Sequence, residues 1–255
     1  MMYNPMDLSN KRILVTGASS GIGRETAIVL SKLGATVFLL DVNEQGLIDT
    51  VSMLESNVHH QYRAINLLDI EKIEPLIREI IKDGPFNGFV HCAGIAPMRP
   101  FLMTKVDNIE KVMRINFYSF VEIVRILIKS KRGFVNGGSI VAMSSTGSIH
   151  GKPTKIAYSA SKASIDAAIR CMTVELKERK IRINTVMPSW VRTQMYDSFM
   201  ADYPDSTDVK EIVEKQYLGV SDPYEVANTI AFLLSDATKT ITGTTILMDG
   251  GLLNG

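Results

Sequence analysis

Residues 12–33 read RILVTGASSGIGRETAIVLSKL, and this stretch decides the fold class. It runs from the apolar segment 12–16 through three closely spaced glycines into the amphipathic segment 24–33. Aliphatic and β-branched residues favour a buried strand in the first part, and apolar residues at helical spacing favour a helix in the second. The stretch therefore predicts a strand, a glycine turn and a helix in direct succession.

The same alternation of strand and helix continues along the chain. Segments with helical periodicity, such as 109–124 and 165–176, separate short apolar runs, and a weaker run broken by polar residues lies at 59–66. Parallel neighbouring strands need long right-handed crossovers, which helices provide. We therefore predict an α/β fold, a doubly wound parallel sheet of about seven strands with helices on both faces. The six clear strands are 12–16, 36–40, 86–91, 139–143, 182–186 and 244–248.

Length and composition predict one domain that handles a small molecule. The 255 residues show no repeat or linker, so residues 1–255 are expected to form a single domain. With 28 basic and 27 acidic residues, the chain lacks the charge suited to nucleic acid or an anionic membrane. We find no apolar stretch typical of a signal peptide or a membrane span, and no metal-ligand spacing among the cysteines and histidines. A cytoplasmic protein without a metal is expected.

The glycine turn is a candidate seat for a diphosphate. Glycines between a strand and a helix let the backbone approach a phosphate, and the free N–H groups of the new helix favour negative charge. An ordinary tight turn would also need glycine. The residues expected to contact the diphosphate are Gly17, Ser19, Ser20, Gly21, Ile22 and Gly23.

Asp41 ends the next strand, eighteen residues after Gly23, which is close to the offset expected for an acidic ribose contact. Its carboxylate could accept hydrogen bonds from both ribose hydroxyls of NAD. A 2′-phosphate at 4 Å would instead meet a like charge, costing about 4 kcal/mol at an effective dielectric constant of about 20. NAD is therefore expected rather than NADP. Two alternatives stay open: Asp41 caps the following helix, or Arg24 pairs with a 2′-phosphate.

Tyr158 and Lys162 form a second candidate site. They lie four residues apart, so both project from one face of a predicted helix, at the start of its apolar stripe. A lysine there loses hydration, and its charge needs a reason to be present. A neighbouring ammonium and an oxidised nicotinamide would both favour the phenolate of Tyr158. The pair predicts general acid-base chemistry, although YxxxK also occurs by chance.

Order and spacing of further motifs make the chain resemble a short-chain dehydrogenase/reductase of the common type of roughly 250 residues. The resemblance implies the Rossmann variety of the doubly wound fold, hydride transfer between a nicotinamide cofactor and an alcohol or carbonyl carbon, and a homo-oligomer, either a dimer or a tetramer. It runs from Lys11 to Gly250. The motifs that support it are TGASSGIG at 16–23, CAG at 92–94, Asn116, SS at 144–145, YSASK at 158–162, residues 188–193 and DGG at 249–251.

The resemblance also implies roles for single residues. Ser145 would bond the substrate oxygen, and Tyr158 would exchange its proton with it. Lys162 would hold the nicotinamide ribose and tune Tyr158, while Asn116 would complete a water-linked proton relay. Asn116 also lies on an apolar helix stripe, where an unpaired amide would cost about 1–3 kcal/mol, so a polar group must meet it. Ser144 is the rival of Ser145. Further cofactor contacts are implied for Asn66, Leu67, Ala93, Gly94, Val191 and Thr193.

Departures from the family pattern occur at His91-Cys92, Asn66 and Ser189, and none removes a catalytic group. The segment at about 193–220 would cover the substrate with an apolar or mixed surface formed by Met195, Tyr196, Phe199 and Met200 alongside Trp190. Three other functions stay open: a non-catalytic dinucleotide sensor, an NADP-dependent ketoacyl-type reductase, and a sugar-nucleotide epimerase or dehydratase, which would need a longer chain.

Overall fold

A computed structural model describes residues 4–202 and 213–254 of the chain. Seven strands form one parallel sheet in the order β3-β2-β1-β4-β5-β6-β7, which confirms the predicted doubly wound fold of one domain. The strands are β1 (Arg12–Thr16), β2 (Thr36–Asp41), β3 (Gln61–Ala64), β4 (Phe86–His91), β5 (Phe134–Met143), β6 (Arg182–Pro188) and β7 (Thr245–Met248).

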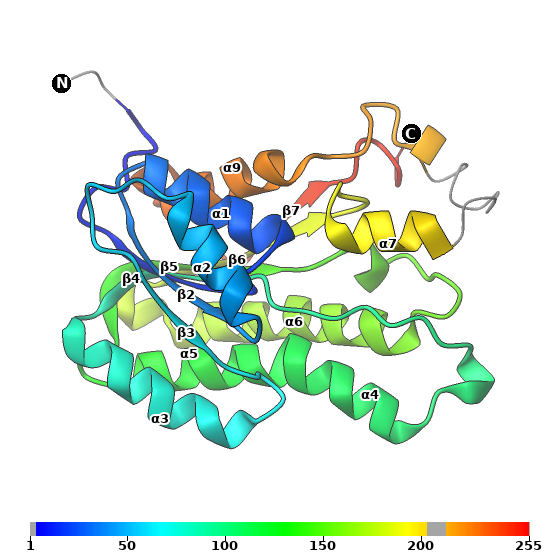
Figure 1. The fold of residues 1–255 in the computed structure, drawn as a ribbon, viewed down its shortest axis with the longest axis horizontal. Coiled ribbons are helices and arrows are strands. Elements are labelled where there is room, and N and C mark those ends of the chain that lie inside the picture. The colour runs from blue at the N-terminus through cyan, green and yellow to red at the C-terminus, as the bar shows by residue number, and fades with distance from the viewer. Residues whose placement is uncertain (1–3, 203–212, 255) are drawn as a thin grey trace.

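Helices cover both faces of the sheet. α1, α2 and α9 lie on one face, and α3, α4, α5 and α6 lie on the other (Figure 1). Successive strand residues point to opposite faces. Leu14 therefore packs under α3, α5 and α6, whereas Ile13 and Val15 pack under α1 and α9. The helices are α1 (Gly21–Lys32), α2 (Glu44–Ser52), α3 (Ile70–Ile80), α4 (Val106–Met113), α5 (Ser119–Lys129), α6 (Ile156–Glu175), α7 (Gln194–Asp202) and α9 (Pro223–Leu234).

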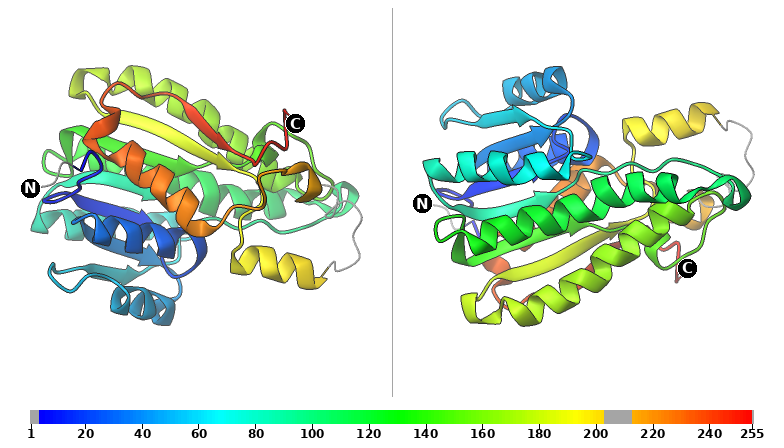
Figure 2. Two further views of the ribbon diagram at one scale, coloured as in Figure 1. Left: turned by 90° about the horizontal axis from the view of Figure 1, so that it is seen from above. Right: turned by 90° about the horizontal axis from the view of Figure 1, so that it is seen from below.

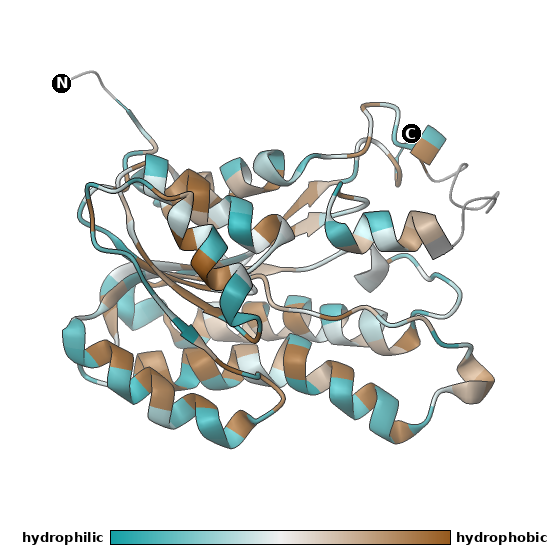
Figure 3. Cartoon of the chain, in the orientation of Figure 1, coloured by the Kyte–Doolittle hydropathy of each residue, from teal (hydrophilic) through white to brown (hydrophobic). Residues whose placement is uncertain are grey.

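The helices have apolar and polar faces, as the hydropathy of the sequence indicates. The helices carry apolar and polar residues in alternation along their length (Figure 3). This pattern is typical of a helix that buries one stripe against a sheet. None of the helices within residues 4–202 and 213–254 combines the length and the apolar character that crossing a bilayer requires.

The direction of the winding reverses between β1 and β4. From β1 the chain builds outwards through β2 and β3, and from β4 it builds in the other direction through β5, β6 and β7. The carboxyl ends of β1 and β4 are neighbours, since Thr16 pairs with His91. Open α/β sheets bind ligands outside the carboxyl ends of their strands at such a point. α7 lies beyond this end of the sheet, apart from both helix layers (Figure 2).

Two details differ from the sequence prediction. β5 begins at Phe134, five residues before the predicted start, and its pairing with β4 is irregular between Phe86 and Gly88. The predicted helix 109–124 is interrupted by a π-helical turn, Arg114–Tyr118, that joins α4 to α5. Such turns widen a helix and free backbone groups from the regular ladder.

Candidate active site

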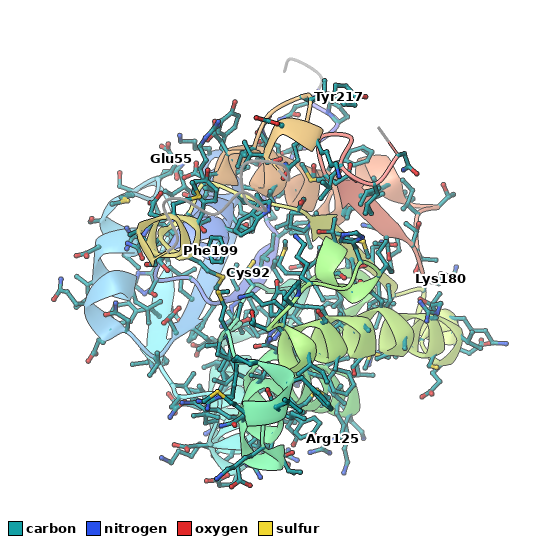
Figure 4. All side chains as sticks on the ribbon, turned by 90° about the vertical axis from the view of Figure 1, so that its right-hand side faces the viewer. Glu55, Cys92, Arg125, Lys180, Phe199 and Tyr217 are labelled. Carbon is teal, nitrogen blue, oxygen red and sulfur yellow. The ribbon has the colours of Figure 1, made fainter. Side chains whose placement is uncertain are left out.

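One cavity of about 1170 Å³ lies beyond the carboxyl ends of β1, β4 and β5. Figure 4 looks onto this end of the molecule, where Cys92 follows β4 and Phe199 lies on α7. Of the predicted site residues, all except Asn116 line the cavity. They are Gly17, Ser19, Ser20, Gly21, Ile22, Gly23, Asp41, Asn66, Leu67, Ala93, Gly94, Ser145, Tyr158, Lys162, Val191 and Thr193.

The glycine turn leaves no room for side chains. Gly17 has φ +70°, and a Cβ there would lie 2.6 Å from the backbone nitrogen of Ala93. A Cβ at Gly23 would collide with the carbonyl oxygen of Gly17. The N-cap of α1, Ser20, makes no side-chain bond to the first turn, so the first N–H groups of α1 stay available. The turn fits a diphosphate.

Asp41 lies at the edge of this turn and does not cap α2. Its Oδ2 accepts from the Ser19 N–H at 3.1 Å, and its Oδ1 accepts from the Asn43 N–H at 3.0 Å. Asn43 itself caps α2, because its Oδ1 accepts from the Gly46 N–H at 3.0 Å. The Asp41 carboxylate therefore joins the glycine turn to the end of β2.

Arg24 is held behind the turn. Its Nε donates to Thr50 Oγ1 at 3.0 Å, and its guanidinium also donates to the carbonyl oxygens of Ser19 and Gly46. Three of the five N–H donors of the guanidinium are therefore occupied by other groups of the protein. An approach of Arg24 to a 2′-phosphate would require it to give up part of this network.

The two serines after β5 have different surroundings. The Ser144 hydroxyl donates to the buried carboxylate of Asp166 at 2.8 Å, although Ser144 also lines the cavity. The Ser145 hydroxyl accepts from the Gly147 N–H at 3.1 Å. A Cβ added at Gly147 would lie 3.4 Å from Ser145 Oγ and 3.6 Å from Tyr158 Cε1, so the two side chains are neighbours. Geometry therefore favours Ser145 over Ser144 as the serine that faces the tyrosine.

Burial raises the pKa of Tyr158, and the hydrogen bond with Ser145 opposes this rise. The expectation that the lysine ammonium and an oxidised nicotinamide together favour the phenolate concerns the protein with its cofactor and stays a prediction. Lys162 Nζ lies 5.8 Å from the centroid of the tyrosine ring and donates to the Met143 carbonyl at 2.7 Å. Its charge is thus directed at the end of β5 rather than at the phenol oxygen.

Lys162 is almost fully buried, with 3% of its surface exposed. Burial lowers the pKa of Lys162 to about 8, against the opposing effect of the Asp166 carboxylate. Burial also raises the pKa of the Cys92 thiol to about 12, so this neighbour stays protonated at neutral pH. Lys162 therefore places a buried positive charge in the wall of the cavity, beside Tyr158.

Asn116 lies in the π-helical turn, behind the cavity wall. Its Oδ1 accepts from the Ile95 N–H at 2.9 Å, and its Nδ2 donates to the Ile95 carbonyl at 3.0 Å and to Ser161 Oγ at 2.9 Å. The prediction that polar groups meet this buried amide is confirmed. Asn116 ties the loop after β4 to α6.

His91 extends this network to the glycine turn, a role that the sequence analysis missed. Its Nδ1 bonds with Thr16 Oγ1 at 2.9 Å, and its Nε2 bonds with the Asn116 carbonyl at 3.2 Å. Burial and the charge of Lys162 lower the pKa of His91 to about 3, so the imidazole is neutral. The signal in the sequence is a histidine at the last position of an apolar strand.

The end of the cavity away from the glycine turn is the candidate substrate side, and its surface contains both apolar and polar residues. Trp190 packs against Phe199 and Tyr196 on α7, with ring centroids 4.8 and 5.8 Å apart. Met195 lines the cavity as predicted, whereas Met200 does not. Residues 203–212 of the predicted covering segment lie outside the described part of the chain. Lys152 and Lys155 also line this end, and the sequence analysis missed both.

Comparison with known proteins gives relatives over the whole chain. The sequence model described as enoyl-(acyl carrier protein) reductase matches residues 17–253. L-xylulose reductase of Caenorhabditis elegans is 34% identical over 97% of this chain and 98% of its own. Carbonyl reductase [NADPH] 2 of Sus scrofa is also 34% identical, over 97% of this chain and 98% of its own.

A solved structure with a similar fold comes from Sinorhizobium meliloti. It is described as a putative short-chain alcohol dehydrogenase, and it is 30% identical to this chain with a TM-score of 0.88. The match covers 98% of this chain and 99% of that protein. The similarity in fold thus extends over nearly the whole chain.

The substitution Gly23→Ala tests the close approach within the glycine turn. Because the added methyl group collides with the Gly17 carbonyl, we expect the free energy of unfolding to fall by about 1–3 kcal/mol and NADH binding to weaken. Gly151→Ala is the matched control, since a Cβ there meets nothing within 4 Å. Urea unfolding and NADH fluorescence titration measure both effects. Wild-type stability and affinity in Gly23→Ala would contradict the proposed seat.

The substitution Lys162→Met tests the burial of the ammonium. The folded pKa of about 8 lies below the unfolded value of about 10.4, so the unfolded state binds more protons between these values. The cost of burying the charged lysine is therefore complete below about pH 8, and it decreases as the pH rises from about 8 to about 10.4. Relative to the variant, wild type should gain about 2 kcal/mol of unfolding free energy between about pH 7 and about pH 9.5.

Urea unfolding at both pH values measures this gain. Lys177→Met, which removes an exposed lysine, serves as the control. A difference between wild type and Lys162→Met that does not change with pH would show that the ammonium is not desolvated.

Proposed function

Because the chain belongs to the short-chain dehydrogenase/reductase family, we propose that its cavity is the catalytic site of an NAD-dependent alcohol dehydrogenase or carbonyl reductase with Tyr158 as the general acid-base. The general activity follows from the relatives. The chain is an oxidoreductase that transfers a hydride between a nicotinamide cofactor and an alcohol or carbonyl carbon. The observation that supports the roles best is that Ser145, Tyr158 and Lys162 line one cavity with the glycine turn.

The residues present fit a dinucleotide. The turn from Gly17 to Gly23 brings bare backbone and open N–H groups to the cavity, where they would hold the diphosphate. Thr193 lies against this turn, because a Cβ on Gly21 would be 3.3 Å from its Cγ2. Gly94 similarly lies beside Lys162, whose Nζ would be 3.6 Å from an added Cβ. A bound nicotinamide would supply the hydride donor or acceptor.

In the reductive direction, the proposed role of Tyr158 is to give its proton to the oxygen of the substrate. The raised pKa keeps the phenol protonated at neutral pH, which suits a proton donor. Ser145, which lies beside Tyr158, would hold the same substrate oxygen through its hydroxyl. Lys162 would bind the nicotinamide ribose.

Asn116 would act by positioning. Both ends of its amide are occupied by Ile95 and Ser161, so the side chain holds the loop after β4 against α6. A role for Asn116 in a water-linked relay stays a prediction.

The preference for NAD is part of this proposal. Of the described residues that line the cavity, Asp41 is the charged one beside the glycine turn, and the lysines lie toward Tyr158 and Trp190. A 2′-phosphate would therefore meet a carboxylate, while Arg24 is engaged with Ser19, Gly46 and Thr50. A relative whose name includes NADPH stands against this preference, so measurement of both cofactors is needed.

Three further features belong to the proposal. We infer that α7 covers the substrate, since Tyr196 and Phe199 line the cavity. A cytoplasmic location is consistent with the two free thiols, Cys92 and Cys171. A homo-oligomer, dimer or tetramer, is expected for the family.

The substitution Tyr158→Phe tests the acid-base role. It removes the hydroxyl and keeps the ring, so we expect turnover to fall by at least about 100-fold, the scale of a lost general acid. Tyr118→Phe is the control, because that hydroxyl lies outside the cavity and bonds with Glu110. The assay follows NADH oxidation with a ketone panel that includes L-xylulose. Turnover retained in Tyr158→Phe would remove the phenol from the mechanism.

The cofactor preference predicts that wild type binds NADH more tightly than NADPH in a fluorescence titration. Asp41→Asn removes the charge and keeps an acceptor oxygen, so NADPH affinity should rise by about tenfold or more. Asp49→Asn on the exposed face of α2 is the matched control. Tighter binding of NADPH by wild type would overturn the role given to Asp41.

A further inference from the structure

Two lysines without an acidic partner face the candidate substrate side of the cavity. Lys155 is the N-cap of α6, three residues before Tyr158, and Lys152 precedes it in the same loop. Lys155 Nζ donates to the Ala96 carbonyl at 2.7 Å, which leaves two of its three N–H directions unused. Lys152 Nζ lies 5.2 Å from the centroid of the Trp190 ring.

The charges at this end are unbalanced. Neither ammonium forms an ion pair with a carboxylate in the described part of the chain. Asp41 is the one acidic side chain among the described residues that line the cavity, and it lies beside Ser19 at the opposite end. Two partly buried like charges repel each other, and an anion between them would relieve this repulsion.

Burial affects both lysines, and the repulsion affects Lys155. Burial lowers the pKa of Lys152, and burial together with the charge of Lys152 lowers the pKa of Lys155 to about 8. An anion bound between the two ammonium groups would favour their charged form.

Buried polar atoms without a partner gather around the same end. They are the hydroxyls of Thr146, Thr154, Ser159 and Ser189 and the indole N–H of Trp190, all on residues that line the cavity. Buried polar groups in folded proteins nearly always have a hydrogen-bond partner. A ligand with several oxygen atoms would supply these partners, while the rings of Trp190 and Phe199 would cover its carbon face.

We propose that the substrate is an oxygen-rich anion of the sugar-acid or sugar-phosphate class, whose acidic group is bound by Lys152 and Lys155 while its reacting carbon lies at Tyr158. This inference rests on the proposed function, since it places the reacting carbon by the role given to Tyr158. It does not depend on the choice between NAD and NADP.

Binding is tested first, because it does not need turnover. Trp190 is the single tryptophan of the chain, so its fluorescence reports on the substrate side. We would titrate the protein saturated with NADH with three alcohols: D-glucitol, D-gluconate and D-glucitol 6-phosphate. NADH cannot be reduced further by an alcohol, so these complexes do not react. The first compound is the neutral reference for the other two.

We expect one of the two anions to bind about ten- to hundredfold more tightly than D-glucitol, the scale of hydrogen bonds to a charged group. In Lys152→Gln and Lys155→Gln this preference should fall by about tenfold or more, with affinity for D-glucitol and for NADH unchanged within about twofold. Lys177→Gln, which removes an exposed lysine before β6, is the matched control. Thermal melting checks that each variant is folded.

Turnover is then compared for two pairs of carbonyl compounds. 5-Keto-D-gluconate and L-sorbose differ by a carboxylate in place of a hydroxymethyl group, and D-fructose 6-phosphate and D-fructose differ by a phosphate. The value of kcat/KM should be higher for the anion in at least one pair, and the lysine variants should lose that preference.

The outcomes separate the two proposals. A preference in the carboxylate pair identifies a sugar acid, and a preference in the phosphate pair identifies a sugar phosphate. Charge-selective binding that depends on the lysines, without turnover of any compound, would sustain this inference and count against the proposed hydride transfer. Equal binding of the neutral and anionic alcohols, or a preference unchanged in both lysine variants, would overturn it even if neutral ketones are reduced.

Discussion

The burial of the Lys162 ammonium is the constraint on which the rest of the site depends. Its bond to the Met143 carbonyl ties α6 to the end of β5, and this fixes Tyr158, one turn earlier, beside Ser145. The opposite wall is fixed by Asn116, which holds the loop after β4. A desolvated charge costs stability, so its presence on a core-facing helix is best explained by chemistry in the cavity.

The strands could be predicted because the signal of a buried parallel strand is local. β1, β2 and β4 are short segments rich in aliphatic and aromatic residues, and their observed bounds match the predicted ones to within one residue. β3 gave a weak signal because it is an edge strand, with Arg63 and Ala64 exposed. The early start of β5 was missed, because its first half contains Gly137 and Gly138 and depends on pairing with β4.

The site was predictable where its residues are close in sequence. The glycine turn and the pair Tyr158 and Lys162 have fixed spacings, so their common side of the sheet follows from the topology. Contacts across the fold were not predictable. Ser144 and Ser145 are distinguished by the carboxylate of Asp166, 22 residues away, and His91 acquires its role from Thr16, 75 residues away. The raised pKa of Tyr158 in the protein alone was not predictable either, because it depends on burial.

The most direct test of this account is the ionisation of Tyr158 itself. Tyrosinate absorbance would be followed against pH in wild type and in Tyr158→Phe, and the difference isolates this residue from the other tyrosines. The account predicts a midpoint above the ordinary value of about 10 in the protein alone and a clearly lower one when NAD⁺ is bound, since a nearby positive charge favours phenolate. A midpoint that NAD⁺ leaves unchanged would contradict the proposal that this phenol exchanges its proton beside the cofactor.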